Sequence, residues 1–218
     1  MLKERETNLP AQERLMEIRP AKSSDSGNIA ELMYSAGPEL YDFLYKTSKK
    51  TALDYIRYEL ASGKGFCGHQ NLTVAVQDGV VVATGCFYDG TAYQQLLKGS
   101  MANMFKFYGP LGIWPVLARS KHLGSVMTTP RRSELYLSNF GVSSTLRGTG
   151  IGSAMLKSRI ELARNAGYKI FSLDVATTNP RAEALYCSHG LRVVKEKTFT
   201  GKRAGMTLPN SRKMELAL

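Results

Sequence analysis

The sequence predicts an α/β fold in which helices cover one mixed β-sheet. Residues 72–88 form two β-branched runs joined by a two-residue turn, the pattern of an antiparallel hairpin. Strand-like and helix-like segments alternate between residues 135 and 199, as in parallel strands that helices connect. The 218 residues, 43% of them hydrophobic, suffice for one core. We therefore expect one domain over residues 15–218. Residues 1–14 are charged and without period, which predicts a flexible N-terminal arm.

A short strand and two helices are expected before the hairpin. Met16–Arg19 has the length of a short strand. After Ser23-Ser24-Asp25, a helix-capping pattern, apolar residues recur at helical spacing up to the stop signal Gly37-Pro38. A second helix is predicted from Ala52 to the stop at Gly63.

The hairpin has a clear strand pattern, whereas the segment after it has none. Leu72–Gln77 and Val80–Tyr88 read as strands closed by Asp78-Gly79. The stretch from about residue 90 to residue 132 fits no single element. Its apolar residues favour a helix that a Gly-Pro pair breaks, and those residues are Leu96, Leu97, Met101, Met104 and Phe105, with the break at Tyr108-Gly109-Pro110.

The C-terminal part is expected to alternate strands with helices. Leu135–Val142 reads as a strand, and Gly141 near its end is typical of a bulge or of a close approach to a ligand. The next helix runs from the glycine-rich turn to about Ala166, with Ile151, Met155 and Leu162 on one face. The remaining expected elements are a buried strand at Ile170–Ala176, a helix at Pro180–Ser188, and closing strands at Leu191–Phe199 and Lys213–Leu216.

Composition and charge limit the classes of protein to consider. No apolar run approaches the ~20 residues that a membrane-spanning helix needs, and the start of the chain lacks the apolar core of a signal peptide. We therefore expect a soluble, cytoplasmic protein without a membrane partner. The net charge of +11 favours anionic partners. Because the basic residues form short, separated clusters, they suit a pocket for a polyanionic cofactor better than a nucleic-acid interface, and we expect no nucleic-acid partner.

Neither the cysteines nor the histidines form a metal-ligand pattern, so no metal site is predicted. The cysteines are Cys67, Cys86 and Cys187, expected as reduced thiols in or near the core, and the histidines are His69, His122 and His189, expected at the surface or in loops.

The glycine-rich turn Arg147-Gly-Thr-Gly-Ile-Gly152 predicts an anion site. Small residues at a helix N-terminus leave free N–H groups at the positive end of the helix dipole, where a phosphate or pyrophosphate binds. A dinucleotide fingerprint would place its third glycine at Ser153, and although Asp174 suits a ribose contact, only about 45 residues follow it. A P-loop is excluded because no Gly-Lys-Ser or Gly-Lys-Thr follows. A plain strand-to-helix turn remains the simplest structural interpretation.

Two motifs together resemble one family. Arg147, Gly150 and Gly152 in the spacing Arg-x-x-Gly-x-Gly resemble the acyl-CoA signature of the GNAT superfamily of N-acetyltransferases. Residues 179–186, Asn-Pro-Arg-Ala-Glu-Ala-Leu-Tyr, followed by Gly-Leu at 190–191, resemble its second signature, which often has Phe where this chain has Leu191. The resemblance extends from about Met16 to the C-terminus. It implies a mostly antiparallel sheet of about six to seven strands, helices on both faces, a splayed V between strands 4 and 5, and a variable insertion at 90–132.

The resemblance also implies acetyl-CoA as the cofactor and assigns residues to it. The backbone amides of the glycine-rich turn would hold the pyrophosphate. The pantetheine arm would lie along the end of the central strand, and Asn179 would bond to the arm while also capping its helix. The implied cofactor-binding residues are Phe140, Gly141, Val142, Arg147, Gly148, Thr149, Gly150, Ile151, Gly152, Ser153, Asn179, Ala182 and Tyr186.

Direct acetyl transfer needs a group that takes a proton from the amine and a group that protonates or stabilises the thiolate. Tyr186 matches the family position near the sulfur and is the candidate general acid. Glu134 is the candidate base, although Asp89 and Glu39 stay open, and a water chain to a distant acid is equally compatible with the family. The structural alternative for each of these acids is a plain solvated side chain.

The acceptor is an amine of unknown identity, on a small molecule or a protein. In this fold the acceptor side is built by residues 37–50 and by the 90–132 segment, and the first contains Glu39, Tyr41 and Asp42, a mixture of aromatic and acidic residues suited to a cationic amine. The aromatic residues there could equally be core or dimer contacts, so a homodimer stays open. The alternative function is a non-catalytic CoA-binding regulatory or interaction domain.

Overall fold

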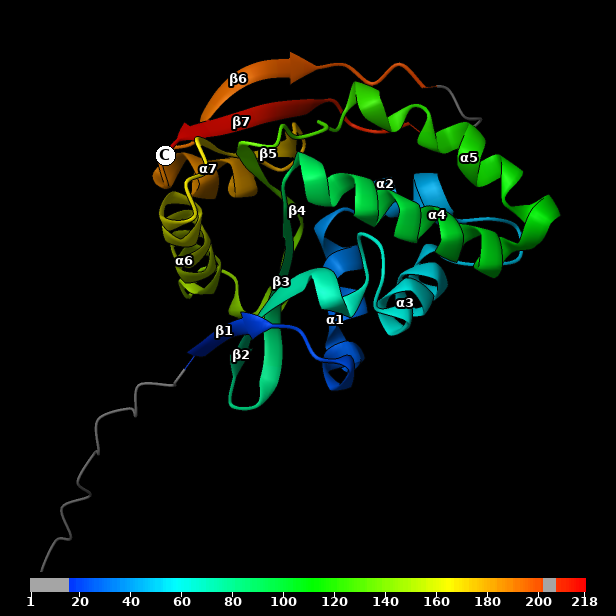
Figure 1. Cartoon of the computed structure of the whole chain (residues 1–218), viewed down its shortest axis with the longest axis horizontal. Coiled ribbons are helices and arrows are strands. Elements are labelled where there is room, and N and C mark those ends of the chain that lie inside the picture. Colours follow the sequence, from blue (N-terminus) through cyan, green and yellow to red (C-terminus); the bar gives the residue numbers. More distant parts are fainter. Residues whose placement is uncertain (1–15, 202–206) are drawn as a thin grey trace, which may run out of the picture.

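The computed structural model describes residues 16–201 and 207–218, so the expected arm at 1–14 lies outside the described residues. Its centre is one seven-stranded sheet in the order β1-β2-β3-β4-β5-β7-β6 (Figure 1). Only β4 and β5 pair in parallel, and the other neighbours are antiparallel. The mostly antiparallel mixed sheet is therefore confirmed. The strands are β1 Met16–Pro20, β2 Leu72–Gln77, β3 Val80–Tyr88, β4 Glu134–Val142, β5 Ile170–Ala176, β6 Arg192–Lys197 and β7 Ser211–Ala217.

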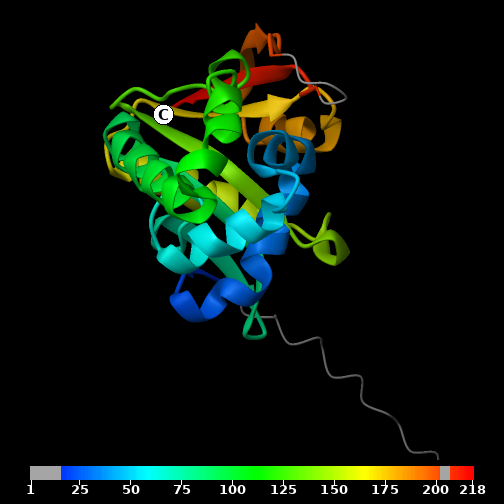
Figure 2. The same cartoon turned by 90° about the vertical axis from the view of Figure 1, so that its right-hand side faces the viewer.

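Helices cover both faces of this sheet, as expected (Figures 1 and 2). One face carries α1 Ser26–Ala36, α2 Pro38–Tyr45, α3 Ala52–Ser62, α4 Gly90–Gly112 and α5 Trp114–Ser120, and the other carries α6 Ile151–Asn165 and α7 Pro180–Ser188. Short 3-10 turns lie at Ser23–Asp25, His69–Asn71, Leu123–Ser125 and Ser144–Leu146. No helix in the described ranges is both long enough and apolar enough to pass through a membrane.

The local signals in the sequence account for several element boundaries. Asp78 and Gly79 both have positive φ angles, 52° and 77°, which is the turn geometry that matches the twist of a tight hairpin. Thr51 and Asp54 form a capping box at the start of α3, and Gly63 ends this helix in the left-handed conformation. The hairpin and the second predicted helix are thus confirmed.

Helix α2, Pro38–Tyr45, was not predicted from the sequence. Residues 37–50 were expected as a connection, but Pro38 occupies the first turn of a helix, where its fixed φ and missing N–H are tolerated. Four of its eight residues are buried, including Tyr41 and Tyr45. Tertiary packing of these aromatic side chains against α3 therefore sustains a helix too short to be stable alone.

The 90–132 segment folds into two helices that meet at a corner. Asp89 caps α4 by accepting bonds from the amides of Thr91 and Ala92. The predicted break is confirmed, since Gly109 has φ 70° and ψ 174° inside α4. The helix after the break, α5, begins at Trp114.

The predicted apolar face of α6 is partly wrong. Ile151 and Met155 are buried as expected, but Leu162 is 45% exposed. The buried positions later in the helix are Ile160 and Ala163, which pack near β4 and β5, whereas Ile151 and Met155 pack near β2 and β3. The helix crosses the strands obliquely, so its buried face shifts around the helix axis along its length.

The remaining corrections are small. The closing strands run over Arg192–Lys197 and Ser211–Ala217, shorter and longer respectively than expected. Cys67 and Cys86 are buried free thiols, whereas Cys187 is exposed and does not belong to the core.

Candidate active site

The two parallel strands at the centre of the sheet separate into a fork. β4 and β5 pair from Glu134 with Ile170 to Leu137 with Leu173, and beyond these residues no further pairing joins them within the described part of the chain. The splayed V between strands 4 and 5 is therefore confirmed. The edges of both strands are left free to bond to something placed in the gap.

Asn139 produces the departure of β4 from β5, whereas the bulge in this strand was expected at Gly141. Asn139 has φ 55°, a left-handed conformation that Asn tolerates. The register with β3 shifts at the same place, so that β4 holds one extra residue. Tyr41 donates a hydrogen bond to Asn139 Oδ1 at 2.8 Å, and Asn139 Nδ2 donates one to the Phe66 carbonyl at 2.9 Å. Side-chain bonds thus hold the bulge in place.

Gly141 has a different reason to be glycine. A Cβ atom at this position would lie 2.2 Å from the Leu32 carbonyl oxygen of α1. The residue permits close packing of α1 on β4, and the bulge belongs to Asn139.

A cavity of about 530 Å³ follows the fork from the glycine-rich turn to α2. β4 contributes Tyr136 to Val142 and β5 contributes Leu173 to Ala176. Eleven of the thirteen predicted cofactor-binding residues line it, and these are Phe140, Gly141, Val142, Arg147, Gly148, Gly150, Gly152, Ser153, Asn179, Ala182 and Tyr186. Thr149 and Ile151 do not, because the Thr149 hydroxyl bonds to the Leu146 carbonyl and Ile151 is buried under the sheet.

The glycine-rich turn presents free amides at one end of the cavity. Gly148 and Gly150 have φ angles of 91° and 93°, a conformation that residues with a Cβ rarely adopt. Gly150 also caps α6 without any side-chain hydrogen bond, so the first-turn N–H groups stay free. Arg147 lies beside them, with its Nε bonded to the Val142 carbonyl at 3.2 Å. This end of the cavity suits a pyrophosphate.

His189, which was expected at the surface or in a loop, touches this turn. Its Nε2 lies 2.7 Å from Ser153 Oγ. Burial, assisted by nearby Lys157, lowers the pKa of His189, so the ring is neutral at pH 7. A neutral ring holds the Ser153 hydroxyl without adding charge to the anion site.

Asn179 and Tyr186 come from α7 on the same side of the fork. Asn179 Oδ1 accepts a bond from the Ala182 amide, which confirms the helix-capping role. Asn179 lines the cavity, and its amide nitrogen has no hydrogen-bond partner among the described residues. Tyr186 is buried, and its hydroxyl likewise forms no hydrogen bond with the part of the chain that the structure describes. Burial raises the pKa of Tyr186, so this hydroxyl keeps its proton.

The predicted acceptor residues are only partly in place. Glu39 and Tyr41 line the other end of the cavity, but Asp42 does not, because it accepts a bond from Tyr34 and pairs with Lys46. Glu39 is exposed and has no ion-pair partner in the described ranges, so it can meet a cation there. Asp89 lies outside the cavity as the cap of α4 and the acceptor for Tyr168.

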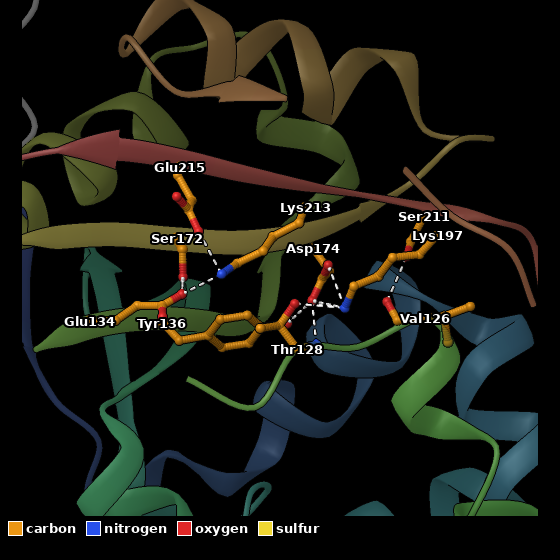
Figure 3. Close-up of polar contacts among 10 residues, drawn as sticks. All are labelled: Val126, Thr128, Glu134, Tyr136, Ser172, Asp174, Lys197, Ser211, Lys213 and Glu215. Carbon is orange, nitrogen blue, oxygen red and sulfur yellow. Dashed lines mark hydrogen bonds and ion pairs between the residues drawn. The ribbon is translucent and has the colours of Figure 1, made fainter. Parts of the chain in front are cut away.

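Glu134, the predicted base, does not line the cavity. It is 1% exposed and lies 3.0 Å from Lys213 Nζ, with Ser172 donating a further short hydrogen bond (Figure 3). Lys213 in turn pairs with Glu215 at 2.6 Å. Burial alone would raise the pKa of Glu134, but the bonds from Ser172, Lys213 and the Arg131 amide lower it overall. The geometry favours a structural role for this carboxylate.

Asp174, by contrast, lines the cavity one residue beyond the last paired position of β5. Tyr136 donates a hydrogen bond to it at 2.8 Å, the Thr128 amide donates another, and Lys197 Nζ lies 3.2 Å from Oδ1 (Figure 3). The sequence offered one signal, since Asp174 is the one charged residue of a mostly apolar strand. Its neighbours come from distant segments that no local pattern connects to it.

Comparisons with known proteins agree with this architecture. A family model described as the acetyltransferase (GNAT) family matches residues 37–191. N-acetyltransferase 8F1 from Rattus norvegicus is 28% identical over 112 residues, which cover 48% of this chain and 51% of the relative, so the match spans about half the relative's length.

Solved structures show the same fold. An N-acetyltransferase from Staphylococcus aureus Mu50 superposes with a TM-score of 0.66 at 18% identity, covering 92% of this chain and 100% of that one. YncA from Salmonella typhimurium, solved with its cofactor acetyl-CoA, has a TM-score of 0.52 at 18% identity, covering 93% and 94% of the two chains.

Proposed function

Because this chain belongs to the acetyltransferase (GNAT) family, we propose that it transfers the acetyl group of acetyl-CoA directly to an amine of a small molecule or a protein. The observation that carries this proposal is that one cavity joins the free amides of the glycine-rich turn, the open fork and the unpartnered hydroxyl of Tyr186. An anion site, a strand edge and a proton donor in one cavity are what this reaction requires.

The residues present fit the cofactor. The free amides of the first turn of α6, with Arg147 beside them, would bind the pyrophosphate. The unpaired edge of β4 at Phe140 and Val142 and the free amide nitrogen of Asn179 would bind the pantetheine arm. When bound, acetyl-CoA supplies a thioester carbonyl for attack by a neutral amine and a thiol as the leaving group.

Tyr186 is assigned as the general acid. Its side chain is buried, and its hydroxyl is protonated and has no hydrogen-bond partner among the described residues, so it can donate a proton as the carbon–sulfur bond breaks. The alternative, a CoA-binding domain without catalysis, has no use for such a donor.

Asp174 replaces Glu134 as the group assigned to receive the proton of the amine. It lies on the face of the fork that also holds Tyr136, whereas Tyr186 comes from α7 on the opposite face. An ammonium group that meets Glu39 at the outer end of the cavity would lose its proton to the Asp174 carboxylate. The neutral nitrogen would form the new bond to the acyl carbon as the carbon–sulfur bond breaks, and the second proton that the nitrogen then loses would restore the proton that Tyr186 gives to the thiolate. The two faces of the fork thus divide the proton transfers.

The binding part of the proposal is tested with two matched glycine variants. Gly150 and Gly167 lie at opposite ends of α6, both with positive φ and with open space where a Cβ would stand. Gly150→Ala should weaken acetyl-CoA binding at least about tenfold, because the strained turn misplaces its amides. Gly167→Ala has the same local strain outside the cavity and should bind normally. Calorimetry that shows equal affinity for both variants would contradict the site.

The catalytic part is tested by measuring acetyl-CoA turnover across small amines, polyamines, amino acids and peptides. Turnover with any of these classes supports the enzyme and names the acceptor. Tight acetyl-CoA binding without turnover in any class would favour the non-catalytic alternative.

A further inference from the structure

The outer side of α4 and the corner that joins it to α5 carry large apolar side chains exposed to solvent. Leu97, Met101 and Phe105 follow one another at four-residue spacing and therefore form one stripe along the helix. Leu111 and Trp114 extend it around the corner and are 86% and 66% exposed. We call these five residues the α4–α5 stripe. Figure 1 shows this corner at the outer edge of the molecule, away from α6.

The segment that carries the α4–α5 stripe has charges of a single sign. Residues 90–132 contain no Asp or Glu. Exposed lysines border the stripe, since Lys98 follows Leu97 and Lys106 follows Phe105 on the helix. The basic residues of the segment are Lys98, Lys106, Arg119, Lys121, Arg131 and Arg132. An apolar stripe with exposed lysines beside it, in a segment without acidic residues, is complementary to a surface that is apolar inside and anionic outside.

A second copy of the chain suits this surface poorly. Two stripes facing each other across a two-fold axis would bring like-charged lysines together without any acidic residue in the segment to offset them. A lipid headgroup layer offers both properties at once, because apolar side chains enter it while lysines stay among the phosphates. Tryptophan at the end of such a stripe is typical of a membrane–water interface.

We propose that the α4–α5 stripe docks on a membrane surface that contains anionic lipids, with α4 lying along the surface. This goes beyond the proposed transferase reaction, because α4 contributes no residue to the cavity. The sequence-based expectation of no membrane partner considered only segments that span a bilayer. A helix that lies on the surface needs no such length.

Trp114 is the sole tryptophan of the chain, so its fluorescence reports on this surface alone. The full-length protein is mixed with vesicles of phosphatidylcholine, with or without phosphatidylglycerol. With the anionic vesicles we expect sedimentation with the lipid and a shift of the Trp114 emission to shorter wavelength. With phosphatidylcholine alone we expect neither change. Binding to both kinds of vesicle equally, or to neither, would overturn the proposal.

Two variants and a control separate charge from apolar contact. Lys98→Gln with Lys106→Gln should weaken vesicle binding about 25-fold, since each lysine near an anionic surface contributes about a factor of five. Arg192→Gln with Lys195→Gln removes equal charge from β6, where two exposed valines also lie, and should change binding little. Phe105→Ser should weaken binding without altering the oligomeric state. If Phe105→Ser instead converts a dimer to a monomer, the stripe is a protein interface and the proposal is wrong.

Acetyl-CoA binding, measured by calorimetry on the same variants, should stay unchanged. Failure of vesicle binding would therefore leave the proposed reaction intact, and failure of turnover would leave the docking surface intact.

Discussion

Two buried ion pairs lie next to each other at the centre of the molecule, and they differ in what they touch (Figure 3). Glu134 pairs with Lys213 at 3.0 Å where β4 and β5 are still joined. Asp174 pairs with Lys197 at 3.2 Å just beyond the last joined residues. Both carboxylates are at most 5% exposed and both accept hydrogen bonds from neighbouring strands or loops. Only Asp174 lines the cavity.

The difference shows that residue type and burial do not decide which acid does chemistry. Glu134 of β4 lies where β4 and β5 are still paired, whereas Asp174 of β5 lies one residue beyond the last paired position. The Glu134–Lys213 pair therefore stabilises the sheet, whereas the carboxylate of Asp174 can contact a substrate in the cavity. The following variants test that distinction, from the largest expected effect to the smallest.

Asp174→Asn should lower kcat about 10³-fold, because the amide cannot accept the proton of the amine. Initial rates with the acceptor found in the turnover screen measure this effect. Asp174→Asn combined with Lys197→Met removes the buried, unpaired cation and restores neutral packing. If the double variant recovers activity, Asp174 acts only as the partner of Lys197, and its assignment as the proton acceptor is wrong.

Glu134→Gln should lower the free energy of unfolding by about 3 kcal/mol, the low end for breaking a buried ion pair, because Lys213 then keeps only the partly exposed Glu215 as its charged partner. Denaturant titration measures the loss, and kcat of the folded protein should stay near that of the parent chain. Combining Glu134→Gln with Lys213→Met should return most of the stability. A large fall in kcat for folded Glu134→Gln would assign the chemistry to this pair instead.

Tyr186→Phe should lower kcat about 10²-fold with little change in acetyl-CoA affinity, because the ring stays and only the proton donor is lost. This variant tests the proton donor on the face of the fork opposite to Asp174. Combined with Asp174→Asn, it should add to the loss of rate, as expected for two separate proton transfers. A rate equal to that of the parent chain would remove Tyr186 as the acid.

Lowering the pH should weaken the Glu134–Lys213 ion pair and reduce the stability that it contributes. The folded-state pKa of Glu134 lies below its unfolded value, so the stability it contributes is present above the unfolded value and is lost as pH falls through the folded one. The stability difference between the parent chain and Glu134→Gln should therefore shrink below about pH 4. Thermal unfolding at pH 7 and at lower pH checks this, and a constant difference would contradict the lowered pKa.

Local patterns were enough to predict the hairpin, the glycine-rich turn, β5 and α7. In each of these, residues close in sequence determine the structure, such as Asp78 with Gly79 or Asn179 with the Ala182 amide. The cavity-lining position of Tyr186 follows from the same short motif. The chemical roles of these residues remain predictions.

The parts that were missed depend on contacts between distant residues. The bulge at Asn139 is held by Tyr41, 98 residues away, and the pocket around Asp174 is closed by Thr128, 46 residues away. Glu134, the candidate base, is the first residue of β4. Its actual surroundings depend on Lys213 in β7, which no spacing in the sequence relates to it.

The fork makes the stability of the folded chain depend on whether a ligand fills the gap between β4 and β5. A sheet with an unpaired gap at its centre is completed only when a ligand occupies that gap, and a ligand that binds only the folded state stabilises it by about 2.7 kcal/mol at one hundred times its dissociation constant. A chain with such a gap persists longer when its ligand is abundant and is cleared sooner when the ligand is scarce. The same opening that admits the reactants would then adjust the amount of protein to the material available.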